Sequence, residues 1–250
     1  MHSQAMRLAP SDVPKNCQCQ GRFNMGELQE LVEVIREVGP DNIWRPVYSP
    51  ANELLAAGRG NLCNGLPNDL EPFDFKGKTV VDIGCNFGYY TFVVKRAGAG
   101  HITGIDSDNR IIRGCRILQH LFGMNGISFK TADVGNVEDL GSFHTGMMID
   151  FIGKIMVGTG VMKEYFNSLE SLSEKEMIIT IKPAYHVIKH LNGDFHGLHE
   201  KYPEDYIRDN SFHIIDYVGD RFRHKWHMRI VPQKRRSNGA DKELLHFTRK

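Results

Sequence analysis

The stretch from Thr79 to Arg96 constrains the fold more than any other part of this 250-residue chain. It begins with the apolar run Thr79–Ile83, passes through a turn that carries Gly84 and Gly88, and continues without another turn signal. This order predicts a buried strand, a tight turn and a helix. Because glycines let a backbone approach a ligand closely, we expect a ligand to bind at this turn, against the helix N-terminus.

The same alternation continues along the chain. The predicted strands are His101–Ile105, Ile127–Lys130, Met147–Ile152 and Met177–Ile181, and the predicted helices are Tyr89–Ala97, Asn109–Phe122 and Val161–Leu172. Strands that alternate with helices indicate an α/β fold, in which a parallel sheet is covered on both faces. Phe212–Val218 and Trp226–Val231 are predicted to close this sheet as an antiparallel pair.

We expect three parts in the chain: an N-terminal helical extension or lid (residues 1–75), a ligand-binding domain (76–232) and a basic C-terminal tail (233–250). In the extension, Asn24 is a good N-cap for a first helix, and residues 51–57 are also predicted to be helical. The residues between contain Trp44, Arg45, Tyr48 and Arg59, which either form a pocket wall or anchor the extension. A short helix is predicted at residues 241–247.

Composition narrows the class of protein. The net charge is only +1, although ten Lys and Arg stand against two acids from residue 221 onward, which is either a solvated surface or a patch for an anionic partner. Five cysteines in a chain of this length argue against a disulfide framework, and Cys17-Gln18-Cys19 is a weak metal signal. No apolar run is long enough for a membrane span, so we expect a cytoplasmic protein.

The predicted turn has the pattern Asp82-x-Gly84-x-Asn86-x-Gly88, which differs from the G-x-G-x-x-G pattern of dinucleotide sites. Asp82 would repel a pyrophosphate and suits a positively charged ligand. Asp106 stands at the expected end of the next strand. In an open parallel sheet both positions lie at the edge where ligands bind, so the sequence predicts a nucleoside site.

These residues resemble those of the class I S-adenosylmethionine-dependent methyltransferases. Asp82–Gly88 looks like motif I, Asp106 like the ribose-binding acid, and Ala132-Asp133-Val134 like the segment that meets adenine. The resemblance covers about residues 76–182. It implies a Rossmann-like fold, with a seven-stranded, mostly parallel sheet and an antiparallel C-terminal strand, and S-adenosyl-L-methionine as the cofactor.

The resemblance also implies roles for single residues. Gly84 and Gly88 would allow close passage of the methionine part, and Asp82 would place its amino end. Asp106 would accept hydrogen bonds from both ribose hydroxyls. Asp133 would accept from the adenine amino group, to which Val134 adds a backbone N–H. The remaining expected cofactor contacts are Cys85 and Asn86 in the first turn, Ser107 after Asp106, and Asp150 near the fourth strand.

Methyl transfer needs an in-line approach, and it needs a base only if the acceptor must lose a proton. The acceptor should lie near Asp150, Phe151 and Lys154, or near Lys182. As catalytic residues we expect His186, Tyr185 and Lys154, with His186 as the candidate base. The pairs His186 with His190 and His196 with His199 have spacings that metal ligands use, but Gly193 interrupts the helix this would need, and no metal is predicted.

A looser similarity concerns the acceptor. Gly65-Leu66-Pro67, the run from Phe75 to Asn86, and Arg96–Ala99 are similar to bacterial methyltransferases related to the tRNA wobble-uridine carboxymethyltransferases. We expect a small-molecule acceptor and keep two alternatives open. One is a tRNA-modifying methyl- or carboxymethyltransferase, and the other is a module that binds S-adenosylmethionine without catalysis.

Overall fold

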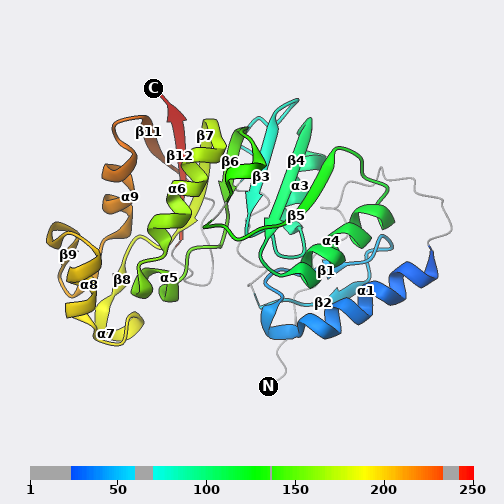
Figure 1. Cartoon of the computed structure of the whole chain (residues 1–250), viewed down its shortest axis with the longest axis horizontal. Helices are drawn as coiled ribbons and strands as arrows, with labels where there is room; N and C mark the ends of the chain where they lie inside the picture. Colours follow the sequence, from blue (N-terminus) through cyan, green and yellow to red (C-terminus); the bar gives the residue numbers. More distant parts are fainter. Residues whose placement is uncertain (1–23, 60–69, 136, 233–241) are drawn as a thin grey trace, which may run out of the picture.

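A computed structural model describes residues 24–59, 70–135, 137–232 and 242–250, and its centre is a seven-stranded sheet (Figure 1). The strand order is β11-β12-β7-β6-β3-β4-β5. Strands β3 to β7 of this sheet run parallel, β12 is antiparallel to both of its neighbours, and β11 closes the edge. The predicted α/β fold with one antiparallel C-terminal strand is thereby confirmed.

Several strands begin and end close to the predicted positions, while β6, β7 and β12 differ from the prediction. The strands of the sheet are β3 (Thr79–Ile83), β4 (His101–Asp106), β5 (Ile127–Thr131), β6 (Phe143–Met148), β7 (Ser173–Ile181), β11 (Trp226–Val231) and β12 (Glu243–Arg249). The prediction of a strand at 147–152 was wrong, because β6 ends at Met148. Residues 149–153 instead form a loop at the carboxyl edge of the sheet.

Helices cover both faces of the sheet because neighbouring strand residues point to opposite sides. Val80 and Ile102 pack on α3 (Tyr89–Arg96) and α4 (Asn109–Leu121), while Val81 and Ile105 belong to the core beneath α6 (Met162–Leu172). On this second face also lie α5 (Lys154–Thr159), α8 (Phe195–Lys201) and α9 (Ile214–Phe222). The apolar runs of the strands are thus explained by burial on two sides.

Two predictions for the C-terminal part were wrong. Residues 214–222 form the helix α9, with Ile214, Tyr217 and Val218 buried on one side, so they are no strand. The predicted helix at 241–247 and the expected tail contain β12 instead, which lies between β11 and β7. Its register with β7 pairs Leu245 with Ile179. Residues 233–241 lie outside the described residues.

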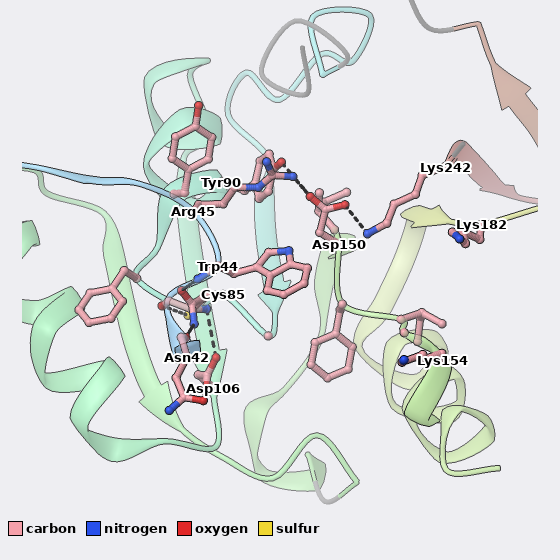
Figure 2. A pocket seen from close by; sticks show the side chains of 18 of the residues that line it. Asn42, Trp44, Arg45, Cys85, Tyr90, Asp106, Asp150, Lys154, Lys182 and Lys242 are labelled. Atoms are coloured by element: carbon pink, nitrogen blue, oxygen red, sulfur yellow. Dashed lines mark hydrogen bonds and ion pairs between the residues drawn. The ribbon is translucent and has the colours of Figure 1, made fainter. Parts of the chain in front are cut away.

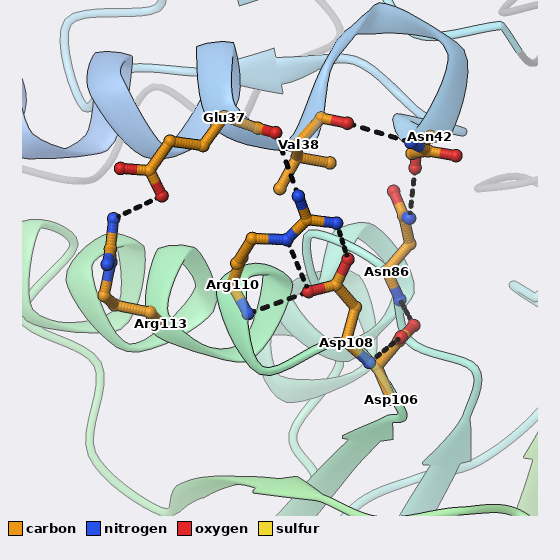
Figure 3. Close-up of polar contacts among 8 residues, drawn as sticks. All are labelled: Glu37, Val38, Asn42, Asn86, Asp106, Asp108, Arg110 and Arg113. Atoms are coloured by element: carbon orange, nitrogen blue, oxygen red, sulfur yellow. Dashed lines mark hydrogen bonds and ion pairs between the residues drawn. The ribbon is translucent and has the colours of Figure 1, made fainter.

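The N-terminal segment packs against the sheet domain through helix α1 (Met25–Val38). The predicted N-cap is confirmed, since the Asn24 side chain accepts the Gly26 N–H. Helix α1 lies along α4, where Arg113 donates to the Glu37 carboxylate at 2.9 Å and Arg110 to the Glu37 carbonyl at 3.1 Å (Figures 1 and 3). The predicted helix at 51–57 was wrong, because this region is a hairpin of β1 (Val47–Tyr48) and β2 (Leu54–Ala56).

The remaining elements are short. They are the 3₁₀ turns η2 (Pro40–Asn42), η4 (Glu138–Leu140) and η5 (Glu204–Tyr206), helix α7 (Val187–His190), and a small sheet of β8 (Tyr185–His186), β9 (Ile207–Arg208) and β10 (Ser211–Phe212). No helix in the described ranges has the length and apolar character needed to cross a membrane.

Candidate functional site

A cavity of about 580 Å³ lies at the carboxyl edge of the parallel strands (Figure 2). The turn after β3, the end of β4, the loop after β6 and the residues after β7 each supply part of its wall, and residues 41–45 supply another. Its charged and aromatic lining consists of Asp41, Trp44, Arg45, Phe87, Tyr89, Tyr90, Asp106, Asp150, Phe151, Lys154, Lys182, Tyr185, His190 and Lys242. The cavity is where a parallel sheet of this order binds ligands.

The turn after β3 brings its backbone to the cavity. Gly84 has a φ of +71°, and a Cβ at this position would clash with the ring of Phe151. The amides of Gly84 and Cys85 both donate to the Ile105 carbonyl at 2.9 Å, which fixes the turn on β4. Gly84, Cys85 and Asn86, which the sequence predicts as cofactor contacts, line the cavity. Gly88 is buried as the left-handed N-cap of α3 and is not part of the described wall.

Asp106 ends β4 with its carboxylate in the cavity wall (Figures 2 and 3). Its Oδ2 accepts the Asn86 N–H and its Oδ1 accepts the Asp108 N–H, both at 3.1 Å. Burial raises the pKa of Asp106, while these backbone hydrogen bonds oppose the rise. Because a carboxylate oxygen can accept more than one hydrogen bond, the carboxylate keeps acceptor capacity for a ligand. The carboxylate therefore fits a ligand that offers two adjacent hydroxyls.

Asp82 has a different environment from the one expected. It is only 2% exposed, does not line the cavity, and accepts a hydrogen bond of 2.6 Å from the Thr91 hydroxyl. Desolvation by burial raises the pKa of Asp82 to about 6. Asp82 thus lies beneath the turn after β3, and its hydrogen bond with the Thr91 hydroxyl is inside the protein.

Asn86 connects the turn to the N-terminal segment. Its side-chain amide donates to the Asn42 carbonyl at 2.8 Å, and its Oδ1 accepts the Trp44 N–H at 3.0 Å (Figures 2 and 3). Asn86 itself has a φ of +47°, a conformation that asparagine tolerates. Trp44 lines the cavity and is 41% exposed, so the interpretation of Trp44 as a pocket wall is the one that the geometry favours. Tyr48 lies at a second, smaller cavity.

Asp150 is the centre of an ion-pair group on the far side of the cavity (Figure 2). Arg45 forms an ion pair with its Oδ2, and Lys242 one with its Oδ1 at 2.7 Å. The Asp150 side chain is 3% exposed, its backbone has a φ of +55°, and its N–H donates to Thr180. Three segments that are distant in sequence therefore meet at one carboxylate. The sequence predicts Asp150 as a site residue but gives no signal for Lys242, because its strand was not recognised.

Two of the three expected catalytic residues line the cavity, namely Tyr185 and Lys154. Burial raises the pKa of Tyr185 to about 12, so this hydroxyl keeps its proton at neutral pH. His186 is not in the described wall; its Nδ1 faces the Lys189 N–H at 3.4 Å, at the start of α7. His190, and not His186, is in the described lining of the cavity.

His190 is oriented by a backbone hydrogen bond. Its Nδ1 accepts the His186 N–H at 3.0 Å, and desolvation together with nearby cations lowers its pKa. In the neutral ring the single proton is then on Nε2, because Nδ1 acts as the acceptor. His190 can therefore donate a hydrogen bond through Nε2 but has no free nitrogen for use as a base.

The other expected cofactor residues lie outside the described wall of the cavity. Ser107 and Asp133 are exposed, and Val134 is buried in the core. The Ala132 N–H donates to the Asp106 carbonyl at 3.0 Å, so this segment adjoins the end of β4.

Within the described ranges no three His, Cys, Asp or Glu residues gather to hold a metal ion. Cys17, Cys19 and residues 65–67 lie outside these ranges.

Parts of this chain are similar in sequence to known methyltransferases. A tRNA U34 carboxymethyltransferase of Campylobacter hominis is 41% identical over 75 residues, which are 30% of this chain and 26% of that protein. A ribosomal protein L11 methyltransferase of Sodalis glossinidius is 35% identical over 81 residues, 29% of this chain and 28% of that one. The matches thus cover only about a quarter of the length of these relatives. They confirm the looser similarity predicted from the sequence.

Solved structures support the fold. The bifunctional kinase-methyltransferase WbdD aligns with a TM-score of 0.57 and 15% identity over 87% of this chain and 47% of that one. A putative rRNA-methylase from Clostridium thermocellum has a TM-score of 0.51 and 12% identity over 76% and 96%.

The family model described as "Methyltransferase domain" matches residues 74–226, more than half of the chain. The expected class, S-adenosylmethionine-dependent methyltransferase, is confirmed at this level. The chain belongs to the methyltransferase domain family.

Proposed function

We propose that this protein transfers a methyl group from S-adenosylmethionine to a small molecule, and that both bind in the cavity at the carboxyl edge of the sheet. The observation that carries the proposal is the continuity of the cavity. Asp106 lies in one part of its wall, and Lys154, Lys182 and Tyr185 lie in another. S-adenosylmethionine supplies an electrophilic methyl group on a sulfonium.

The residues present fit the cofactor. Asp106 has acceptor capacity on both oxygens for a ribose diol, and Gly84 has no side chain to obstruct a ligand along the turn. Asp133 and Val134 remain proposed adenine contacts and Ser107 a proposed cofactor contact, because the hydrogen bond from the Ala132 N–H to the Asp106 carbonyl keeps this segment beside the end of β4. Asp82 remains a proposed partner of the amino end through Thr91 or water.

The described cavity favours transfer without proton abstraction. Tyr185 keeps its proton, and the Nδ1 of His190 is engaged, so both groups are donors. In the transfer the acceptor's lone pair forms the new bond to the methyl carbon, and the electrons of the broken bond stay on sulfur. An acceptor atom that already has a free lone pair needs no base. Trp44 and Phe151 exclude water from the wall and orient the acceptor.

A second candidate is a tRNA-modifying methyl- or carboxymethyltransferase. It is favoured by the 41% identity to the tRNA U34 carboxymethyltransferase. A module that binds the cofactor without catalysis is the third candidate.

A cytoplasmic location is part of the proposal, since Cys85 and Cys115 are free thiols, which fits a reducing compartment.

Methyl-labelled S-adenosylmethionine distinguishes these candidates. The labelled cofactor is incubated with the protein and with a metabolite extract, total tRNA or total protein as separate acceptor pools. We expect label in the metabolite pool. Label in tRNA instead supports the second candidate, and binding of the cofactor with no transfer to any pool supports the third.

A further inference from the structure

The acceptor side of the cavity contains more positive than negative charge. Among the described residues, four cations line it together with the carboxylate of Asp150, namely Arg45, Lys154, Lys182 and Lys242. Asp106 lies in the opposite part of the wall, beside the turn after β3 (Figure 2), and Asp41 is a further acid of the lining. A concave wall with one sign of charge concentrates ligands of the opposite sign.

The carboxylate of Asp150 is already shared between two of these cations. Arg45 pairs with one oxygen and Lys242 with the other. Among the described residues, neither Lys154 nor Lys182 forms an ion pair with a carboxylate. The charge that remains for a ligand is therefore that of the two lysines.

The two lysines come from different elements and converge on the same place. Lys154 begins α5, and Lys182 follows β7, with its Nζ 5.9 Å from the ring centre of Tyr185. Both line the same cavity as His190, and their charges contribute to the lowered pKa of that histidine. Figure 2 shows both on the side of the cavity away from Asp106. The two lysines thus offer two positive charges on one side of the cavity.

We propose that the methyl acceptor is a small anion, whose carboxylate or phosphate group binds between Lys154 and Lys182 while its apolar body packs against Trp44 and Phe151. This inference rests on the proposed function and names the substrate class of the same site.

The test uses the full-length protein loaded with S-adenosylhomocysteine and calorimetric titration with three probes. Benzoate and phenyl phosphate have the proposed charge, and benzamide has the same ring without it. Binding is measured for the wild type, for Lys154→Met, Lys182→Met and the double variant, and for Lys189→Met. Lys189 is an exposed lysine of α7 that is not part of the cavity wall, so it controls for a general loss of positive charge.

We expect at least one anion to bind the wild type about tenfold more tightly than benzamide, since a charge-assisted contact contributes that much. The double variant should lose this preference and Lys189→Met should keep it. Equal binding of benzamide, no measurable binding of either anion, or a preference that survives in the double variant would overturn the proposal. If S-adenosylhomocysteine itself does not bind, the proposed function fails; if it binds and the anions are not preferred, only this inference fails.

Discussion

The side chain of Asn86 holds the backbone of Trp44: its Oδ1 accepts the Trp44 N–H at 3.0 Å, while its amide donates to Asn42. A turn in the sheet domain thereby fixes the N-terminal segment as a wall of the cavity. Glycine could adopt the same φ but could make neither contact.

Asn86→Gly should lower the free energy of unfolding by about 1–2 kcal/mol, because two hydrogen bonds are lost without backbone strain. Urea unfolding measures the change. Asn52→Gly is the matched control, since Asn52 also has a positive φ of 62°, in an exposed turn. Equal effects of the two substitutions would mean that Asn86 does not hold the segment.

Asp150→Asn should destabilise the protein by on the order of 3 kcal/mol, because the buried Arg45 and the half-buried Lys242 lose a carboxylate that is itself only 3% exposed. Glu176→Gln is the control: its pair with Lys78 is 3.0 Å long but about one-fifth exposed on both sides, and we expect a loss of about 1 kcal/mol or less. Thermal and urea unfolding of both variants measure the difference. A loss for Asp150→Asn no larger than that of the control would contradict the assigned role.

Asp82→Asn should change how stability depends on pH. The pKa of the buried carboxyl is raised from 3.8 to about 6, so between these values the folded protein holds a proton that the unfolded chain has released. Stability of the wild type therefore falls as the pH rises through this window, by up to about 3 kcal/mol. The variant lacks the group and should gain stability relative to the wild type from pH 4 to pH 7.

Urea unfolding at several pH values measures this profile. Asp139→Asn, at an exposed carboxylate, should run parallel to the wild type. A difference between Asp82→Asn and the wild type that does not change with pH would show that Asp82 is not a buried acid with a raised pKa.

The sequence predicts the parallel half of the sheet because its signals are local. Thr79–Ile83 is apolar, glycines follow it, and Asp106 ends the next strand, so pattern and turn chemistry agree. The start of α1 is equally local, since Asn24 caps it.

The remaining features depend on distant contacts. β12 reads as a basic, mostly polar tail until its pairing with β7 buries Leu244, Leu245 and Phe247. Burial also overrides the pattern in α9, whose β-branched residues fit a helix once one side packs on the core. Lys242 and Arg45 reach the cavity only through such packing, and the role of His190 depends on a hydrogen bond that sequence spacing cannot reveal.

Calorimetry with S-adenosylhomocysteine tests most directly whether this chain binds S-adenosylmethionine through Asp106. Asp106→Ala should weaken binding by about 1–3 kcal/mol, because the hydrogen bonds to the ribose are lost. Asp108→Ala is the control, since Asp108 caps α4 and pairs with Arg110 outside the cavity wall. We expect wild-type affinity for Asp108→Ala, a marked loss for Asp106→Ala and no tight binding of NAD. Undiminished binding in Asp106→Ala, or tighter binding of NAD than of S-adenosylhomocysteine, would contradict binding through Asp106.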